Sequence, residues 1–175
     1  MKRFVAIGAA LLMAAACSGD DTPTTPSGNA GPIVLTASLS AANEVPPIAN
    51  AEANARGTVI ITFDVPRNAA GAVTGAGTIS FSAQLASFPA GTPATLAHIH
   101  IGTAGVTGLP VVNTTLSAAS PVLLDANGSG TLTFINIPIS QADATAIVAN
   151  PAGYYFDVHT TLNPTGAVRS QLVRQ

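Results

Sequence analysis

Charged side chains are scarce in this chain of 175 residues. Lys, Arg, Asp and Glu together make up 8% of it, against roughly 25% in ordinary soluble domains. Lys2 is the only lysine. The sequence therefore lacks the basic surface that binds nucleic-acid phosphates and the internal lysine that a P-loop or a Schiff-base enzyme uses. It also lacks the many charges that long surface helices and coiled coils need.

Cysteine is nearly absent as well. Cys17 is the only one, so the chain can form no internal disulfide, and its thiol is the only one that a Cys/His dyad could use. No Gly-x-Ser-x-Gly sequence marks a nucleophilic serine. The two glutamates, Glu44 and Glu52, fall in an early loop without an evident partner. These absences favour a protein that is not an enzyme.

The N-terminus predicts export. Lys2 and Arg3 precede an apolar or small-residue run from Phe4 to Ala16, which suits a signal peptide and is shorter than the ~20 residues of a membrane span. We predict a signal peptide over 1–16. Three alanines then lead to Cys17, a pattern that resembles a bacterial lipobox, and we predict that this cysteine is lipidated. The alternative is an ordinary secretory signal with an incidental cysteine.

The segment 17–31 predicts a tether between that lipid and a folded domain. After the cysteine it contains no aliphatic or aromatic side chain larger than alanine, so it cannot join a hydrophobic core. Ser18 follows Cys17, which resembles the sorting pattern of outer-membrane lipoproteins. We therefore expect a membrane-anchored protein on the periplasmic face or at the cell surface, most simply at the outer membrane.

Residues 32–175 predict one all-β domain. Apolar residues alternate in several short segments, as in Thr78 to Leu85, where Ile79, Phe81, Ala83 and Leu85 share a face. A Ser-x-x-Asp sequence at Ser140 predicts one short helix over 141–148. Eight or nine short strands with one helix predict an antiparallel Greek-key β-sandwich, immunoglobulin-like or superoxide-dismutase-like. The predicted strands are 33–41, 58–65, 78–85, 96–101, 111–116, 121–124, 131–137, 154–160 and 167–174.

Two strand pairings can be predicted from turn residues. Asn127-Gly128 is a strong hairpin signal, so we expect 121–124 to pair with 131–137. The turn at 163–166 predicts a second hairpin centred on Pro164, with His159 opposite Arg169 and Asp157 opposite Gln171.

All three histidines fall on these strands. Alternation places His98 and His100 on one face of their strand, and Tyr155, Asp157 and His159 on one face of another. With the predicted hairpin, one sheet face gathers a polar group that comprises His98, His100, Asp157, His159, Arg169 and Gln171.

Three interpretations of this group remain open. The histidines could bind Cu or Zn, with Asp157 as a further ligand or as a residue that orients them. Alternatively, Asp157 pairs with Arg169, the histidines form hydrogen bonds with the backbone, and this structural network fixes strand register. The third interpretation is a contact surface for a carbohydrate or another ligand.

The motifs resemble the CHRD domain, named for chordin, from about Leu35 to Gln171. The segment 39–47 (LSAANEVPP), with Glu44, Pro46 and Pro47, is similar to the family's Leu-x-Gly-x-(Asn/Gln)-Glu-Val-Pro-Pro. The segment 97–100 (AHIH), followed by PVV at 110–112, is similar to its Ala-His-Ile-His and Gly-Pro-Val-Val. The segment from Tyr155 to Leu172 is similar to its Tyr-x-Asn-Val-His-Thr and Pro-x-Gly-Glu-Ile-Arg-Gly-Gln-Leu.

The sequence departs from the family pattern at four positions. Ala167 replaces a usual Glu, Ser170 a usual Gly and Asp157 a common Asn, while Leu109 interrupts Gly-Pro. Any site that the family builds with this glutamate therefore lacks it here. The resemblance implies a β-sandwich and no established catalytic activity.

We therefore expect an envelope-anchored, non-enzymatic binding or structural module whose ligand, a protein or a small molecule, is unknown. The alternative is a Cu- or Zn-binding envelope protein that uses His98, His100 and His159.

Overall fold

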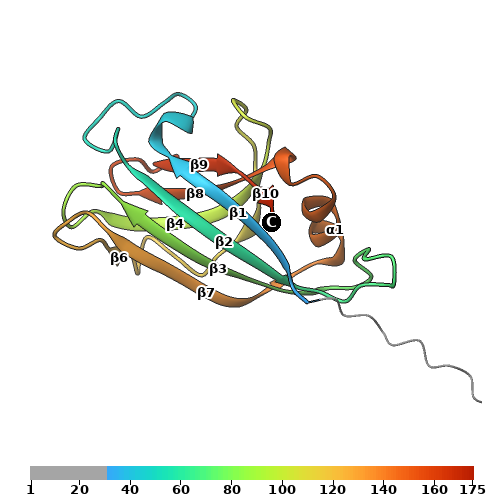
Figure 1. Cartoon of the computed structure of the whole chain (residues 1–175). Helices are drawn as coiled ribbons and strands as arrows, with labels where there is room; N and C mark the ends of the chain where they lie inside the picture. The colour runs from blue at the N-terminus through green and yellow to red at the C-terminus, as the bar shows by residue number, and fades with distance from the viewer. Residues whose placement is uncertain (1–30) are drawn as a thin grey trace, which may run out of the picture.

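The computed structural model describes residues 31–175 (Figure 1). The predicted signal peptide, Cys17 and nearly all of the predicted tether lie outside these residues. The described chain forms ten strands, one α-helix and two short 3-10 helices. Their bounds are β1 Ile33–Ser40, η1 Ala41–Asn43, β2 Arg56–Asp64, β3 Gly77–Ala86, β4 Pro93–Ile101, β5 Pro110–Asn113, β6 Val122–Leu123, β7 Gly130–Ile139, α1 Gln141–Ala149, η2 Pro151–Gly153, β8 Tyr154–Thr160, β9 Val168–Gln171 and β10 Val173–Arg174.

The strands form two layers that join along one side. Hydrogen-bonded neighbours follow the order β5-β4-β8-β9-β1-β2-β3-β7, with β10 beside β1 and β6 beside β4. The connections from β3 to β4 and from β7 to β8 cross between the layers, in the manner of a Greek key (Figure 1). All the strand pairs are antiparallel. The predicted all-β sandwich with one short helix is confirmed.

The core lies between the layers because the predicted alternation holds. On β2 and β3 the side chains of Ile61, Phe63 and Phe81 are buried to within 1% of full burial. From the other layer Phe156 of β8 packs against Phe81, with ring centroids 5.6 Å apart. Burial of such side chains contributes about 1.5–3 kcal/mol each, and in the absence of a disulfide it holds these two layers together.

One predicted pairing is wrong. The segment 121–124 does not pair with 131–137, because β6 pairs with β4 and β7 pairs with β3 along its whole length. The Asn-Gly turn does form, and Oδ1 of Asp125 accepts hydrogen bonds from the backbone of Asn127 and Ser129. The turn packs against Phe88, whose amide donates to the Gly128 carbonyl. The ten-residue β7 pairs along β3, which has the same length, instead of along the two-residue β6.

The helix begins where its cap predicts. Oγ of Ser140 accepts a hydrogen bond from the Asp143 amide at 3.0 Å and donates to the Asp143 carboxylate at 2.6 Å. Ala144 and Ile147 are buried against the sandwich. Across residues 31–175 no helix is long and apolar enough to span a membrane.

Candidate functional site

The three histidines lie together because β4 and β8 are neighbours. The register places His98 opposite Asp157, His100 opposite Tyr155 and Leu96 opposite His159. Paired residues point to the same side of a sheet, so all these side chains lie on one face. The opposite face of β4 carries Ala97 and Ile99, which are fully buried. The core thus fixes the strand that presents the two histidines of β4.

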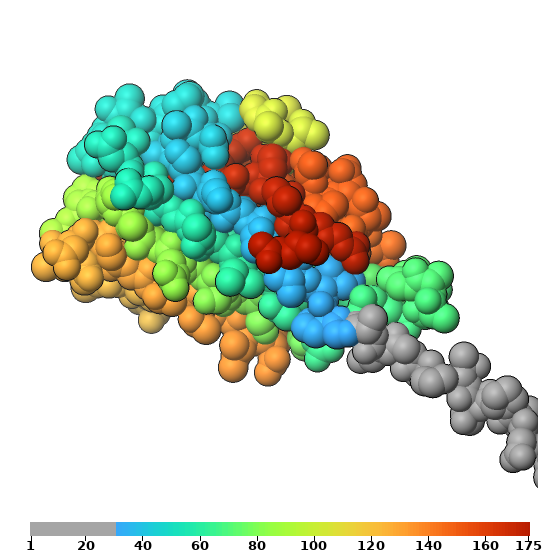
Figure 2. Space-filling model, in the orientation of Figure 1, coloured from blue at the N-terminus to red at the C-terminus, as the bar shows by residue number. Residues whose placement is uncertain are grey.

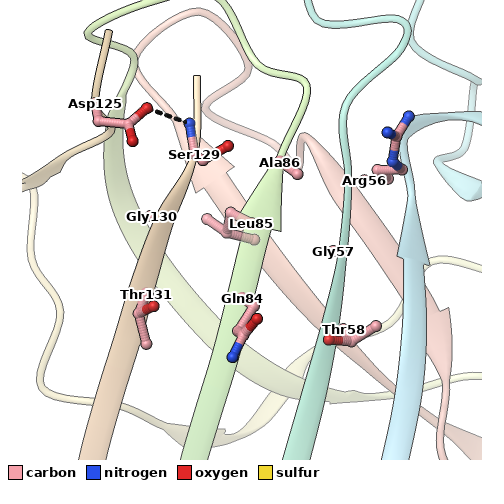
Figure 3. Close-up of a pocket in the computed structure, with 10 residues that line it drawn as sticks. All are labelled: Arg56, Gly57, Thr58, Gln84, Leu85, Ala86, Asp125, Ser129, Gly130 and Thr131. Atoms are coloured by element: carbon pink, nitrogen blue, oxygen red, sulfur yellow. Dashed lines mark hydrogen bonds between the residues drawn. The ribbon is translucent and has the colours of Figure 1, made fainter. Parts of the chain in front are cut away.

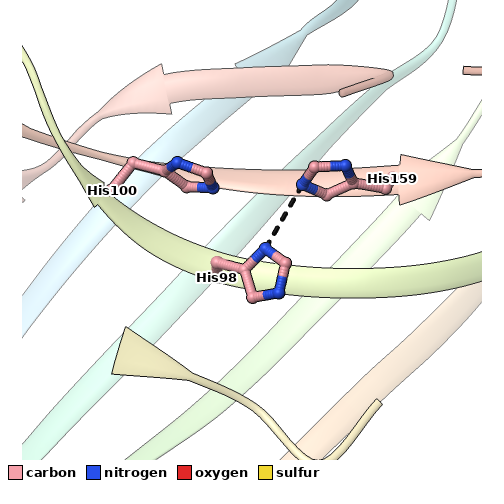
Figure 4. A group of neighbouring side chains, drawn as sticks. All are labelled: His98, His100 and His159. Carbon is pink, nitrogen blue, oxygen red and sulfur yellow. Dashed lines mark hydrogen bonds between the residues drawn. The ribbon is translucent and has the colours of Figure 1, made fainter. Parts of the chain in front are cut away.

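The imidazole nitrogens face one another (Figure 4). One nitrogen from each ring lies within 4.8 Å of the other two. Nδ1 of His98 and Nε2 of His159 are 3.3 Å apart. The ring centroids of His98 lie 5.4 Å from His100 and 5.0 Å from His159. The three rings therefore form a candidate metal-binding group.

Backbone carbonyls fix the orientation of two of the rings. Nδ1 of His100 donates to the Gly108 carbonyl at 2.9 Å, and Nδ1 of His159 donates to the Pro164 carbonyl at 3.0 Å. Each of these rings is neutral with its lone pair on Nε2. His98 can then donate from Nδ1 to Nε2 of His159. Nε2 of His100 is buried and has no hydrogen-bond partner.

Burial keeps the three rings neutral. It lowers the pKa of His98 to about 4, and the neighbouring imidazoles His159 and His100 add to the effect. It also lowers the pKa of His100 and of His159, although the hydrogen bonds to the Gly108 and Pro164 carbonyls act in the opposite direction. Neutral imidazoles offer lone pairs, so at neutral pH the cluster is a set of nitrogen donors.

The predicted register of the final hairpin is wrong by two residues. Arg169 lies opposite Asp157 and Gln171 opposite Tyr155, whereas the sequence places Arg169 opposite His159. The turn is centred on Asn163, whose carbonyl accepts from the amides of Thr160 and Gly166. A shift of two residues preserves the face on which each side chain lies, so the same residues still meet on one face.

Arg169 forms no ion pair with Asp157, contrary to the structural interpretation of the sequence. Its guanidinium lies 3.9 Å from the centre of the Tyr155 ring, and Nη2 donates to the Val106 carbonyl at 2.9 Å. The side chain is only 2% exposed. The charge of Arg169 is therefore used for a cation–π contact and for holding the loop 102–109.

That loop is fastened over the polar face by its backbone. Gln171 donates to the Gly102 carbonyl, and the Gly108 amide donates to the Tyr155 hydroxyl. His100 and Arg169 add the bonds to Gly108 and Val106 given above. In Figure 2 the loop, coloured yellow, lies against the 41–47 segment in cyan and the C-terminal strands in red. The loop therefore covers the polar face, and Arg169 and Gln171 hold the loop in place.

Glu44 is a site residue that the sequence alone leaves without a partner. It lies beside Asp157 at Gly166, where an added Cβ would be 2.8 Å from Oε2 of Glu44 and 2.9 Å from Oδ2 of Asp157. Both carboxyls are buried, and Oε1 of Glu44 and Oδ1 of Asp157 have no hydrogen-bond partner. The neighbouring motif residues Pro46 and Pro47 are exposed. Ala167, where the family usually has Glu, is fully buried in the core.

Burial raises the pKa of both carboxyls. The pKa of Asp157 rises to about 9, through desolvation and then through the Glu44 charge. The pKa of Glu44 rises to about 7, although the Arg169 guanidinium and a hydrogen bond with Asp157 oppose the rise. Because a second negative charge at this place is unfavourable, the pair holds a proton at neutral pH.

The pair makes the stability of the metal-free protein fall as pH rises. Its pKa values are higher in the folded than in the unfolded chain, so its stabilising contribution is complete at low pH and is lost as pH rises through the folded values. The histidines act in the opposite direction, below pH 6.5. Between pH 6.5 and 9 we expect the free energy of unfolding, measured with urea and a chelator, to fall by about 2 kcal/mol.

The matched variant for this prediction is Glu44→Gln. It removes one of the two carboxyls and should reduce the pH slope. An equal decline in Glu44→Gln and in the unaltered chain would assign the slope to other groups.

Glu52 also has partners that the sequence does not reveal. Oε2 accepts hydrogen bonds from Thr160 at 2.8 Å and from Asn163 at 2.6 Å, and the residue is 1% exposed. Thr160 begins the turn and Asn163 lies at its centre, next to Pro164, whose carbonyl accepts the hydrogen bond of His159. Glu52 is therefore a positioning residue for the histidine cluster.

Two cavities of about 520 Å³ each lie away from the imidazoles. One is a groove at the ends of β2, β3 and β7, lined by residues such as Arg56, Gln84 and Asp125 (Figure 3). The other lies between the 42–47 segment and the 104–105 turn, above Arg169. No histidine lines either cavity.

The family comparison covers nearly all of the described chain. A family model described as the CHRD domain matches residues 35–172, which agrees with the resemblance in the sequence. No curated protein and no solved structure shows a significant similarity to the chain.

Proposed function

The chain belongs to the CHRD domain family, and on that premise we propose that its domain is a non-enzymatic, envelope-anchored module that binds a copper or zinc ion. His98, His100 and His159 are the protein ligands. Imidazole nitrogens suit both metals, and these three rings come from neighbouring strands of one rigid layer.

One observation carries the proposal. Nε2 of His100 is buried, points toward the other two rings and has no partner (Figure 4). Leaving a buried polar group unpaired costs about 1–3 kcal/mol. A metal ion at the centre of the cluster would accept this lone pair together with that of Nε2 of His159. His98 would join through Nδ1 after moving its proton to Nε2.

The backbone around the cluster supports the same interpretation. Histidine ligands in proteins usually donate their second N–H to a carbonyl or carboxylate, which fixes the ring and its tautomer. The Gly108 and Pro164 carbonyls already do this for His100 and His159. The rings would therefore need little rearrangement to bind an ion.

Metal analysis of the purified chain tests the proposal. A Cys17→Ser form, which removes the thiol as a competing ligand, should retain about one equivalent of copper or zinc after dialysis. His98→Ala/His100→Ala should retain none. The control is His98→Ala alone, which should bind more weakly but measurably, because two ligands remain. Equal metal content in the double variant, or no metal in the Cys17→Ser form, contradicts the proposal.

We propose that Cys17 anchors the domain through a lipid, on the sequence of residues 1–31. The predicted signal and tether would place the described domain outside the inner membrane, where it meets exogenous metal. Radiolabelled palmitate should be incorporated by the expressed chain and lost in Cys17→Ser. Retention of label in Cys17→Ser would refute the anchor, and the metal test would be unaffected.

A further inference from the structure

The described chain supplies three ligands to the cluster, each through one nitrogen. Nδ1 of His100 and Nδ1 of His159 are held by carbonyls, so these rings can offer only Nε2. Nδ1 of His98 lies 3.3 Å from Nε2 of His159. Two ligands bound at tetrahedral angles at about 2.0–2.1 Å from one ion lie roughly 3.4 Å apart. His98 and His159 are therefore spaced as two ligands of one four-coordinate ion, and a nitrogen of His100 lies within 4.8 Å of theirs.

Asp157 is the nearest further donor, and its carboxyl is held elsewhere. Oδ2 lies 3.9 Å from Nε2 of His159, but the residue is outside the group of converging ligand atoms. Its carboxyl is packed against Gly166, where it lies beside Oε2 of Glu44. Turning Asp157 toward the ion would move its carboxyl away from this place beside the buried Glu44. Among residues 31–175 the converging set contains the three histidines alone.

The cluster is least covered at His98. His98 is the least buried of the three histidines, whereas His100 and His159 are 7% and 6% exposed. Its β5 neighbour, Asn113, is exposed. Metal sites with four protein ligands are closed, and sites with three protein ligands keep a position for water or another small ligand.

We propose that an ion bound by His98, His100 and His159 keeps its fourth coordination position open, next to His98, to one small exogenous donor such as water or azide. This inference rests on the proposed function. It assigns the site to the exchangeable class of metal centre rather than to the closed structural class, and it makes Asp157 a neighbour of the ion and not a ligand.

Azide titration of the copper form tests the inference. Full-length Cys17→Ser chain is loaded with one equivalent of Cu(II), and electron paramagnetic resonance and visible absorption are recorded as azide is added. We expect both spectra to change and to saturate at one azide per copper. Water-proton relaxation should be enhanced by the copper form and should fall toward the metal-free value as azide binds.

Asp157→Asn distinguishes the two coordination models. We expect its copper spectrum without azide, and its azide response, to match those of the parent chain. If azide leaves the spectra of the parent chain unchanged, the fourth position is not open and the inference is wrong. It is also wrong if Asp157→Asn by itself changes the copper spectrum. Failure of the parent chain to bind copper at all is a separate result, which rejects the proposed function itself.

Discussion

Replacing Arg169 with alanine should lower the free energy of unfolding by about 3–5 kcal/mol, as expected when one of the largest buried side chains is truncated and its polar contacts are lost. Arg169 is among the largest fully buried side chains of the described domain. Its loss removes the contact with the Tyr155 ring and the hydrogen bond to Val106. It also removes the positive charge that opposes the raised pKa of Glu44 and Asp157.

Urea unfolding at pH 7 in the presence of a chelator measures this loss. The matched control is Arg174→Ala, which removes an exposed arginine from the short strand β10 and should change stability by no more than about 0.5 kcal/mol. If Arg169→Ala lost no more than the control, the loop 102–109 would not depend on this side chain.

Glu52→Ala should cost about 2–4 kcal/mol of stability and weaken metal binding about 10–100-fold. The first effect follows because Thr160 and Asn163 lose their shared buried acceptor. The second follows because these residues shape the turn whose Pro164 carbonyl orients His159. Urea unfolding of the metal-free protein and competition with a chromogenic chelator measure the two effects separately.

Glu52→Gln is the matched variant for this prediction. Its side-chain oxygen can still accept from both donors, so at least half of the lost stability and most of the metal affinity should return. If Glu52→Gln behaved like Glu52→Ala, the charge of Glu52 rather than its hydrogen bonds would account for its role. If Glu52→Ala left metal affinity unchanged, the turn would not be needed to orient His159 for binding.

The strands could be predicted because their periodicity is a local property. In β3, four apolar residues alternate with polar ones, and all four are buried: Ile79, Phe81, Ala83 and Leu85. The buried face of the strand can therefore be read from the local sequence. Pairing is not local. The Asn127-Gly128 turn predicted a hairpin, but β7 pairs with β3 at a distant place in the sequence, where the longer ladder and the larger buried face prevail.

The candidate site could be predicted in part for a similar reason. Residues an even number apart on a strand lie on the same face. A two-residue error in register therefore did not change the face shared by His98, His100, Asp157 and His159. Glu44 and Glu52 could not be assigned because they reach the site from an irregular segment without periodicity. The signal that could have found Glu52 is its scarcity: few acidic residues occur in the chain, and a buried one needs partners.

The loop 102–109 is held by bonds to its main chain, and its shape fixes only part of its composition. Gly102 and Gly105 have φ of 149° and 78°, and an added Cβ at Gly108 would lie 1.7 Å from the Ile101 carbonyl oxygen, so these three positions need glycine. The bonds from His100, Arg169 and Gln171 end on the carbonyls of Gly108, Val106 and Gly102, which every residue type possesses. Thr103, Ala104 and Thr107 are exposed and take part in none of these side-chain bonds. The exposed positions 103, 104 and 107 can therefore accept other residues while the framework beneath them stays constant, much as a recognition loop varies on a fixed scaffold.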